Sequence, residues 1–219
     1  MTAAAEMLMN GPEDAPHRVA LAHGAGVGMD SPFMTAFAEG LAAHNIRVVR
    51  FEFPYMAATR QDGRHRPPNP AATLLTTWRQ VVEALGGPEG LVIGGKSMGG
   101  RMAAMLAQQL EQAGTPVAGV ACLGYPFHPP GKPDEVRLDH FATMRTPTLV
   151  VQGTRDPFGN QDEVAAFELP PQLQLHWAPD GDHHLMPRKT SGYTTEDNWR
   201  EAVAALARFV QALGTAPLP

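Results

Sequence analysis

The sequence predicts an α/β fold, in which a doubly wound, mostly parallel β-sheet is flanked by helices. Short runs rich in Val, Ile and Leu alternate along the chain with stretches of helical periodicity, which is typical of this class. The apolar runs are continuous more often than alternating, as expected for strands that are covered on both faces. The chain has 219 residues, 43% of them hydrophobic, which is enough for one well-packed core. We therefore expect residues 1–219 to form a single domain, with no room for a large lid.

Six segments are predicted to be strands, because each is short, apolar and bounded by turn-forming residues. They are "RVALAHG" from Arg18, "IRVVRFEFPY" from Ile46, "GLVIGGKS" from Gly90, "VAGVACLGYP" from Val117, "PTLVVQGT" from Pro147 and "LQLHWAP" from Leu173. Helical stretches between such strands imply right-handed crossovers and place a ligand beyond the carboxyl ends of the strands. The only cysteine, Cys122, lies within the fourth run, and we expect it to be a buried strand residue.

Two helices are predicted from apolar side chains that recur on one face. The first stripe consists of Leu74, Leu75, Trp78, Val81, Val82 and Leu85, and the second of Trp199, Val203, Leu206, Val210 and Leu213. We interpret both stripes as core surfaces. The Pro-rich and Gly-rich segments 60–70 and 126–141 are predicted to be loops on the ligand-binding edge.

The stretch "GLVIGGKSMGG", residues 90–100, matches two motifs that imply different chemistry. Its first part fits the phosphate-binding P-loop, and the part from Gly95 to Gly99 fits G-x-S-x-G, the nucleophile elbow of serine enzymes. A P-loop needs a loop directly after its first glycine, whereas residues 91–94 are mostly apolar and fit a buried strand. The elbow needs a strand, a sharp turn at Ser97 and then a helix, which this context provides. We therefore predict that Ser97 is a nucleophile.

Partners for this nucleophile follow in the order in which catalytic triads on such sheets occur, an acid and then a histidine. Asp156 follows the strand "TLVVQGT", and His183 follows the strand "LQLHWAP". The Gly-rich turn in "LAHGAGVG", directly after the first strand, can direct backbone N–H groups at an oxyanion. We assign this role to the N–H groups of Ala25 and Met98. We expect the neighbouring His23 to hold the turn by hydrogen bonds rather than to act as a base.

Other roles for these residues are open. Asp156 could cap the helix that follows it, since Asp at that position satisfies free N–H groups. The acidic and histidine side chains of residues 180–184 could form a metal site, but they lack the ligand spacing of a zinc motif, and we expect no metal. Neighbouring side chains in an extended loop point in opposite directions, so only one of the two adjacent histidines can face Ser97. We choose His183, and expect His184 at the rim of the site or beside Leu185.

The chain resembles the small, lidless α/β-hydrolases that are often described as dienelactone-hydrolase-like. The resemblance rests on "AHGAG", "MDSPFM", "FEFPYM", "GGKSMGG" and "GDH", which begin at Ala22, Met29, Phe51, Gly94 and Gly181. It implies the α/β-hydrolase fold and a triad of Ser97, Asp156 and His183, with the base directly after Gly-Asp. Dienelactone hydrolases proper use a cysteine nucleophile, whereas this chain has Ser97.

The expected chemistry is acyl transfer on a small ester-type substrate through a covalent intermediate, with no metal or organic cofactor. His183 would remove the Ser97 proton, Asp156 would orient His183 and stabilise its charged form, and water would hydrolyse the acyl-enzyme. The alternative is a non-catalytic scaffold of the same fold that binds a ligand or a protein partner in the cleft. The presence of all three triad residues argues against this alternative.

Charge and hydropathy exclude several partner classes. The formal net charge of −5 provides no global basic field for nucleic acid, and no apolar run is long enough to span a membrane. The segment "MTAAAEMLMNGPEDAP" lacks the basic region of a signal peptide, so we expect a cytoplasmic protein.

Positive charge is nevertheless predicted to be concentrated near the site. The cationic side chains after the second strand and beside the elbow are Arg60, Arg64, His65, Arg66, Lys96 and Arg101. We hypothesise that Arg60, Arg64, Arg66 and Lys96 bind a carboxylate or phosphate of the substrate, since arginines bind such groups bidentately. The alternative is an ordinary solvated polar loop.

Overall fold

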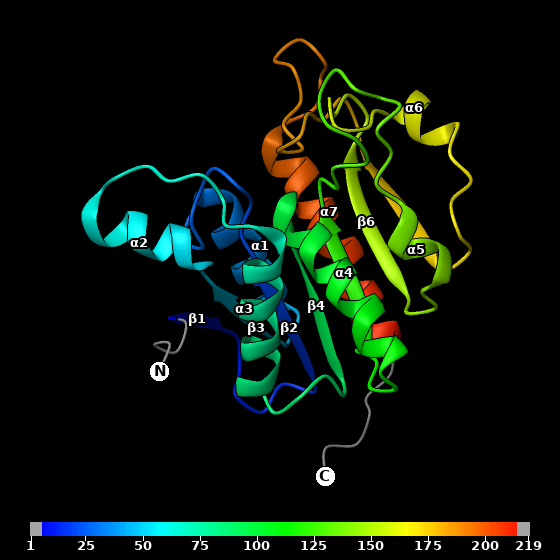
Figure 1. The fold of residues 1–219 in the computed structure, drawn as a ribbon. Coiled ribbons are helices and arrows are strands. Elements are labelled where there is room, and N and C mark those ends of the chain that lie inside the picture. The colour runs from blue at the N-terminus through cyan, green and yellow to red at the C-terminus, as the bar shows by residue number, and fades with distance from the viewer. Residues whose placement is uncertain (1–5, 214–219) are drawn as a thin grey trace.

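The computed structural model describes residues 6–213, in which seven strands form one sheet (Figure 1). The strands are β1 (Met7–Asn10), β2 (His17–Ala22), β3 (Ile46–Phe51), β4 (Leu91–Lys96), β5 (Gly119–Leu123), β6 (Thr148–Gly153) and β7 (Leu173–Ala178). The helices are α1 (Pro32–Ala43), α2 (Pro54–Asp62), α3 (Ala71–Ala84), α4 (Met98–Gln112), α5 (Asp139–Thr143), α6 (Gln161–Ala165) and α7 (Thr195–Ala212). The strand order is β1-β3-β2-β4-β5-β6-β7, and β1 pairs antiparallel with β3 whereas the other neighbours are parallel.

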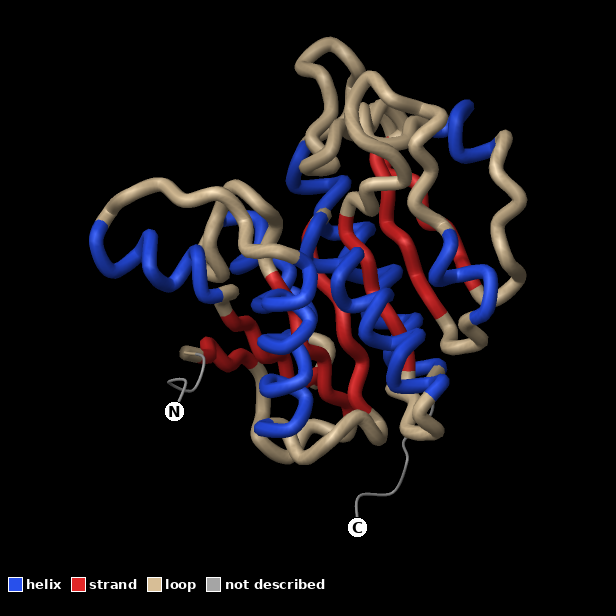
Figure 2. The backbone as a smooth tube through the Cα atoms, viewed as in Figure 1, coloured by secondary structure: helices blue, strands red, loops and turns tan. Residues whose placement is uncertain are grey.

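Helices cover both faces of the sheet, as Figure 2 shows. α1 and α7 pack together on one face, over a core layer that includes Phe37 and Leu206. α3 and α4 pack together on the other face, over a layer that includes Trp78 and Met102. The predicted doubly wound, mostly parallel α/β architecture is therefore confirmed. Cys122 is buried in β5 as predicted, and burial raises the pKa of its thiol.

The sequence prediction missed strand β1. Its four residues do not form a continuous apolar run, and Met9 is exposed because β1 lies at the edge of the sheet. β1 is held by pairing with β3, with Met7 opposite Phe51 and Asn10 opposite Val48. A short edge strand of this kind depends on its partner more than on its own sequence.

The segment after β3 also differs from the prediction. The predicted strand continued to Tyr55, but β3 ends at Phe51 and Pro54 begins α2. Proline suits the first position of a helix, because the N–H that it lacks would have no partner there. α2 ends at Asp62, so Arg60 lies in a helix and not in the predicted loop.

Candidate active site

The turn at Ser97 joins the carboxyl end of β4 to the start of α4. Ser97 has φ 51° and ψ −116°, a conformation that a non-glycine residue adopts only when its surroundings enforce it. A Cβ atom on Gly95 would collide with the Ala22 carbonyl oxygen, and one on Gly99 would lie 2.5 Å from the Ala22 and His23 carbonyl oxygens. Both positions therefore require glycine. Residues 91–94 are strand, which excludes the P-loop interpretation of this segment.

Three side chains that the sequence singled out form one chain of hydrogen bonds. His183 Nε2 lies 2.8 Å from Ser97 Oγ, and His183 Nδ1 lies 2.8 Å from Asp156 Oδ2. The three residues follow β4, β6 and β7, so they meet at the carboxyl edge of the sheet. In this arrangement the Ser97 hydroxyl donates to Nε2, while the Nδ1–H group of His183 donates to the Asp156 carboxylate.

His184 does not share this arrangement. Its side chain is exposed, and its backbone is held on both sides. The His184 N–H donates to Asp182 Oδ1 at 2.7 Å, and the His184 carbonyl accepts from the Trp199 indole at 2.9 Å. Leu185, the next residue, is fully buried. The two adjacent histidines therefore point to different surroundings.

Asp156 is fully buried and held by groups besides His183. The Phe158 N–H donates to Oδ1 at 2.9 Å, and the Gln152 amide donates to Oδ2 at 3.0 Å. Gln152 is itself fully buried in β6, and its Oε1 accepts from the Tyr125 N–H at 2.7 Å. Sequence reasoning missed Gln152, although a polar amide at the end of a continuously apolar strand is a signal of such a role.

The Gly-rich turn after β2 is fixed through its carbonyl groups. His23 Nδ1 donates to the Gly24 carbonyl at 2.6 Å, while His23 Nε2 accepts from the Phe53 N–H at 3.1 Å. The Tyr55 hydroxyl lies 3.0 Å from the Ala25 carbonyl oxygen, to which it can donate. His23 is buried, which lowers its pKa and favours this neutral tautomer. The predicted structural role of His23 is therefore confirmed.

The two N–H groups predicted for an oxyanion hole belong to Met98, directly after Ser97, and to Ala25 in the turn after β2. Met98 is the first residue of α4, and the first N–H groups of a helix have no partner within it. Ala25 follows Gly24, where an added Cβ would lie 3.7 Å from the Ser97 Cβ atom. The turn that carries Ala25 is thus close to Ser97.

Lys96 is a buried residue that contacts the backbone of His183. Its ammonium group donates to the His183 carbonyl oxygen and lies 5.5 Å from the centre of the Phe33 ring. Burial lowers the pKa of Lys96 to about 8, against the opposing effect of the Asp156 and Asp182 carboxylates. This placement gives no support to the predicted contact of Lys96 with a substrate, because the side chain points into the protein.

The arginines of the predicted positive cluster are mostly neutralised by their neighbours. Arg60 lies 2.6 Å from Glu52 Oε1 and 2.8 Å from Asp30 Oδ2, and Arg66 lies 2.6 Å from Asp62 Oδ2. Arg64 is exposed, and its N–H donates to the Asp62 side chain. These ion pairs account for Arg60 and Arg66 without a substrate, because each guanidinium already has a carboxylate partner. The hypothesis that this cluster binds an anionic substrate is therefore weakened.

Burial governs the electrostatics of His183. Desolvation lowers its pKa, and the hydrogen bond from Nδ1 to Asp156 opposes this effect without cancelling it. The Phe158 ring packs on the imidazole with a centroid distance of 4.2 Å. The imidazole is thus neutral at neutral pH, in the state that can accept a proton.

Other features of the described chain lie apart from this centre. Within residues 6–213 no group of three or more His, Cys, Asp or Glu side chains is arranged to hold a metal ion. Asp180 instead pairs with Arg155 at 2.9 Å and with Arg188 at 2.5 Å.

No helix of the described part is both long and apolar enough to cross a membrane.

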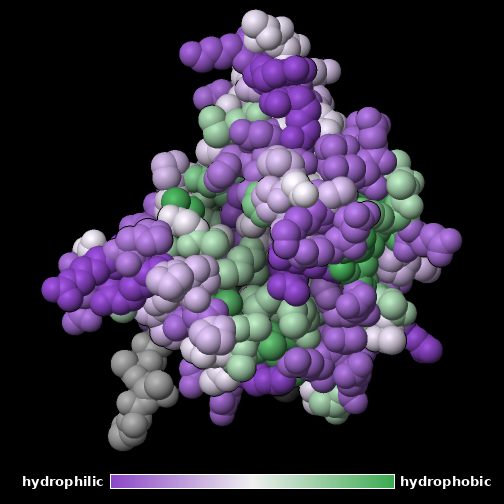
Figure 3. All heavy atoms as spheres, turned by 45° about the horizontal axis from the view of Figure 1, so that its top comes forward, coloured by the Kyte–Doolittle hydropathy of each residue, from purple (hydrophilic) through white to green (hydrophobic). Residues whose placement is uncertain are grey.

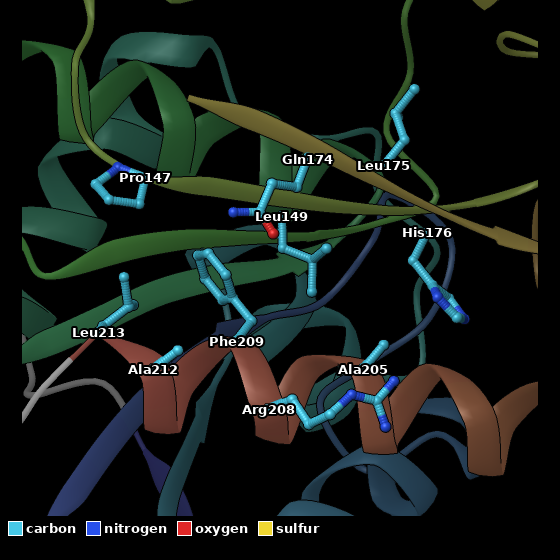
Figure 4. Close-up of a pocket in the computed structure, with 10 residues that line it drawn as sticks. All are labelled: Pro147, Leu149, Gln174, Leu175, His176, Ala205, Arg208, Phe209, Ala212 and Leu213. Atoms are coloured by element: carbon cyan, nitrogen blue, oxygen red, sulfur yellow. The ribbon is translucent and has the colours of Figure 1, made fainter. Parts of the chain in front are cut away.

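A pocket of about 510 Å³ lies between β6, β7 and the end of α7 (Figure 4). Its lining includes Pro147, which precedes β6, and Leu213, which follows α7. These residues mark the amino ends of the strands, whereas Ser97 lies beyond a carboxyl end. The pocket is therefore separate from Ser97, His183 and Asp156.

Comparison with known proteins agrees with this geometry. A family model for the alpha/beta hydrolase domain matches residues 15–211, and the chain belongs to this family. The fold is similar to that of a lidless a/b serine hydrolase from Xanthomonas campestris, with 19% identity and a TM-score of 0.68 over 98% of this chain and 91% of that one. It is also similar to a dienelactone hydrolase from Anabaena variabilis, with 20% identity and a TM-score of 0.66 over 95% and 90%. An esterase domain from Rhodothermus marinus has 18% identity and a TM-score of 0.65 over 94% and 92%.

Proposed function

We propose that this protein is a serine hydrolase that cleaves small ester-type substrates through Ser97, His183 and Asp156. The observation that carries the proposal is the continuous chain of hydrogen bonds between these side chains, with both links at 2.8 Å. Such a geometry lets a neutral histidine take the proton of a serine hydroxyl while a buried carboxylate stabilises the resulting charge. The membership of the alpha/beta hydrolase family supports a hydrolytic reaction.

In the first half-reaction, the Ser97 hydroxyl oxygen attacks the ester carbonyl carbon as its proton passes to His183 Nε2. The tetrahedral intermediate collapses when the bond to the alcohol breaks, and the same proton passes from His183 to the departing alkoxide. The acyl group then remains on Ser97. In the second half-reaction, His183 takes a proton from water, whose oxygen attacks the acyl carbon, and the acid leaves as Ser97 regains its proton.

The N–H groups of Ala25 and Met98 would bind the oxyanion of each tetrahedral intermediate. The proximity of the Gly24 turn to Ser97 and the position of Met98 at the first turn of α4 support this assignment. The carbonyl groups of the turn are tied back by His23 and Tyr55, so the loop is held rigid before a substrate binds. Rigid donors of this kind stabilise charge without reorganisation during the reaction.

The surface around the carboxyl edge favours an acyl chain over a large polar ligand. In Figure 3 this edge is turned toward the viewer. Apolar surface lies there between the polar lobe of α2 and the polar loops on the other side. Apolar surface bounded by polar groups is typical of sites for small molecules. We therefore infer a small ester whose acyl chain packs on this surface.

Labelling with a fluorophosphonate tests the proposal, because this reagent reacts with an activated serine. We expect the folded protein to be labelled, and both the label and hydrolysis of aryl esters to be lost in Ser97→Ala. Circular dichroism would establish that the variant remains folded. Absence of labelling in the folded protein would favour the non-catalytic scaffold, and labelling that persists in Ser97→Ala would exclude Ser97 as the nucleophile.

A further inference from the structure

The Gly-rich turn that carries the Ala25 N–H, residues 24–30, is anchored at both of its ends. At its far end, both backbone polar groups of Met29 are held by side chains from the carboxyl end of β3. The Met29 N–H donates to Glu52 Oε1 at 3.2 Å, and the Met29 carbonyl accepts from Arg50 Nη1 at 2.8 Å. Met29 is itself buried, so these two hydrogen bonds fix this end of the turn against the sheet.

Glu52 is a buried acid, with 4% of its surface exposed. Arg60, from α2, donates to both carboxylate oxygens, from Nε to Oε2 at 2.9 Å and from Nη2 to Oε1 at 2.6 Å. Bidentate pairs of this kind are strong, and a buried carboxylate that loses its partner is an uncompensated charge. Arg60 therefore keeps Glu52 in the position where it accepts from the Met29 N–H.

Arg60 also binds the Gly-rich turn directly. Its Nη1 atom donates to Asp30 Oδ2 at 2.8 Å, and this hydrogen bond lowers the pKa of Asp30, so the carboxylate stays charged. The Gly28 backbone packs on the same group, since an added Cβ would collide with Glu52 Oε1 and lie 3.2 Å from Arg60 Nη2. In Figure 1 the connection from β2 to α1 lies beside α2, as these contacts require. One guanidinium group thus joins α2, the end of β3 and the Gly-rich turn.

The near end of the turn is held from the same part of the chain. His23 bridges the Gly24 carbonyl and the Phe53 N–H. The Tyr55 hydroxyl lies 3.0 Å from the Ala25 carbonyl oxygen. Phe53 is the N-cap residue of α2 and Tyr55 lies in its first turn, so this segment anchors the Gly-rich turn at both ends. Ala25 lies between the two anchors, and the direction of its N–H depends on both.

We propose that Arg60 is a positioning residue for the oxyanion hole, which it supports through Glu52 and Asp30. The proposal rests on the proposed hydrolase function, and it gives Arg60 a role other than binding an anion of the substrate. An oxyanion is stabilised by donors that already point at it, so displacement of the turn weakens this stabilisation even though the Ala25 N–H is still present. The loss falls on the transition state, because the ester carbonyl of a bound substrate carries little charge.

Two substitutions break the bidentate pair in different ways. Arg60→Gln removes the guanidinium group and leaves Glu52 as a buried charge. Glu52→Gln removes the pair without leaving a buried charge, and Arg60 then retains only its contact with Asp30. Arg200→Gln is the control, because Arg200 also forms an ion pair, with Asp197 at 2.6 Å, but within α7. Circular dichroism establishes that each variant is folded.

The first readout is hydrolysis of 4-nitrophenyl acetate, with kcat expressed per molecule that a fluorophosphonate labels at saturation. This normalisation removes any unfolded fraction from kcat. We expect kcat to fall by about tenfold or more in Arg60→Gln and Glu52→Gln while KM changes by less than about threefold, since the lost stabilisation belongs to the transition state. Both constants should stay within about twofold of the wild type in Arg200→Gln. Unchanged kcat in both test variants, or a change confined to KM, would overturn the positioning role.

Amide hydrogen exchange of residues 24–30, followed by mass spectrometry, tests the anchoring without turnover. We expect exchange to be faster by about tenfold or more in Arg60→Gln and Glu52→Gln, and unchanged in Arg200→Gln. Exchange that matches the wild type in both test variants would contradict the anchoring. Absence of labelling in the wild type would remove the hydrolase function and the oxyanion hole with it, whereas labelling of the wild type with unchanged kcat in both test variants would remove only the role of Arg60.

Discussion

The buried position of His183 decides its protonation state more than its acid partner does. Asp156 accepts a hydrogen bond from this histidine and by itself would raise its pKa, yet desolvation is the larger effect and the net shift is downward. Lys96, whose ammonium group is bonded to the His183 carbonyl, acts in the same downward direction. His183 is thus neutral at neutral pH, as the proposed role of a base requires.

The choice between the two adjacent histidines can be tested by paired substitutions. His183→Ala should lower kcat by about 10²-fold or more, because general-base catalysis alone contributes a factor of about 10²–10⁴. His184→Ala should change kcat by less than about tenfold, since its exposed side chain lies outside the hydrogen-bonded chain. Steady-state hydrolysis of an aryl ester measures both. Loss of activity in His184→Ala alone would shift the base by one residue, and loss in neither would contradict the triad.

The pH dependence of kcat/KM should reflect the burial of His183. Since the pKa of His183 is lowered from 6.5, activity should rise with pH through a limb centred below 6.5 and then reach a plateau. Lys96→Met removes a positive charge that disfavours the protonated imidazole, so the limb should move to higher pH in this variant. Rate profiles of both proteins between acid and neutral pH provide the measurement. A limb that stays in place, or moves to lower pH, would show that the Lys96 charge does not act on His183.

The buried ammonium group of Lys96 should also make the free energy of unfolding depend on pH. Its pKa falls from 10.5 to about 8 in the folded protein, so between these values the unfolded chain binds more protons than the folded one. The free energy of unfolding should therefore rise as pH increases from about 8 to 10.5, by on the order of 3 kcal/mol relative to Lys96→Met, which lacks this group. Urea unfolding of both proteins at several alkaline pH values measures the difference. Parallel pH dependence in the two proteins would mean that the buried ammonium is not destabilised.

At the scale of elements, the elbow between β4 and α4 depends on close approach of the β2 backbone. Gly95→Ala should lower the free energy of unfolding by roughly 3 kcal/mol or more, because its Cβ would collide with the Ala22 carbonyl and its φ of 151° disfavours a side chain. Gly26→Ala is the control, since no atom lies within 4 Å of an added Cβ, and it should change stability by less than about 0.5 kcal/mol. Urea midpoints followed by circular dichroism compare the two. Similar midpoints would contradict the close packing of the elbow.

The elements that were predicted well from the sequence are those whose secondary structure is determined by their own residues. The runs that became β4, β5 and β6 are continuously apolar because they lie in the middle of the sheet, and the glycines of the elbow are needed wherever such a turn is made. Strand β1 was missed because its stability comes from β3. The proximity of Ser97, Asp156 and His183 could be predicted from their order along the chain, since each follows a recognisable strand.

Contacts between distant side chains could not be predicted in the same way. Lys96 and Arg60 both looked like cations beside the site, but one is buried beneath His183 and the other is bound by Glu52 and Asp30. Glu52 and Asp30 are separated from each other along the chain, and only the packing of α2 brings both to Arg60. Charge density along a sequence therefore does not reveal which charges are neutralised after folding.

At the scale of the whole molecule, the hydrogen-bonded chain of Ser97, His183 and Asp156 joins parts of the sequence that are far apart. His183 is 86 positions from Ser97 and 27 from Asp156, and the three meet only when β4, β5, β6 and β7 have assembled in order. The polar lobe of α2 and the edge strand β1 lie at the other side of the sheet and contribute no member of the triad. The hydrogen-bonded chain of Ser97, His183 and Asp156 is thus built from the half of the sheet that contains β4 to β7, whereas the turn that carries Ala25 comes from β2 in the other half.

This assembly makes Ser97 a reporter of folding. In an unfolded chain the serine has no nearby histidine and is no more reactive than any other hydroxyl, so on the proposed function a fluorophosphonate counts only molecules in which β4 to β7 are in place. Labelling measured across a urea titration should fall with the same midpoint as the helical circular dichroism signal if the chain unfolds in one step. Loss of labelling at a lower urea concentration would instead reveal a half of the sheet that opens first, so the reagent could map cooperativity as well as chemistry.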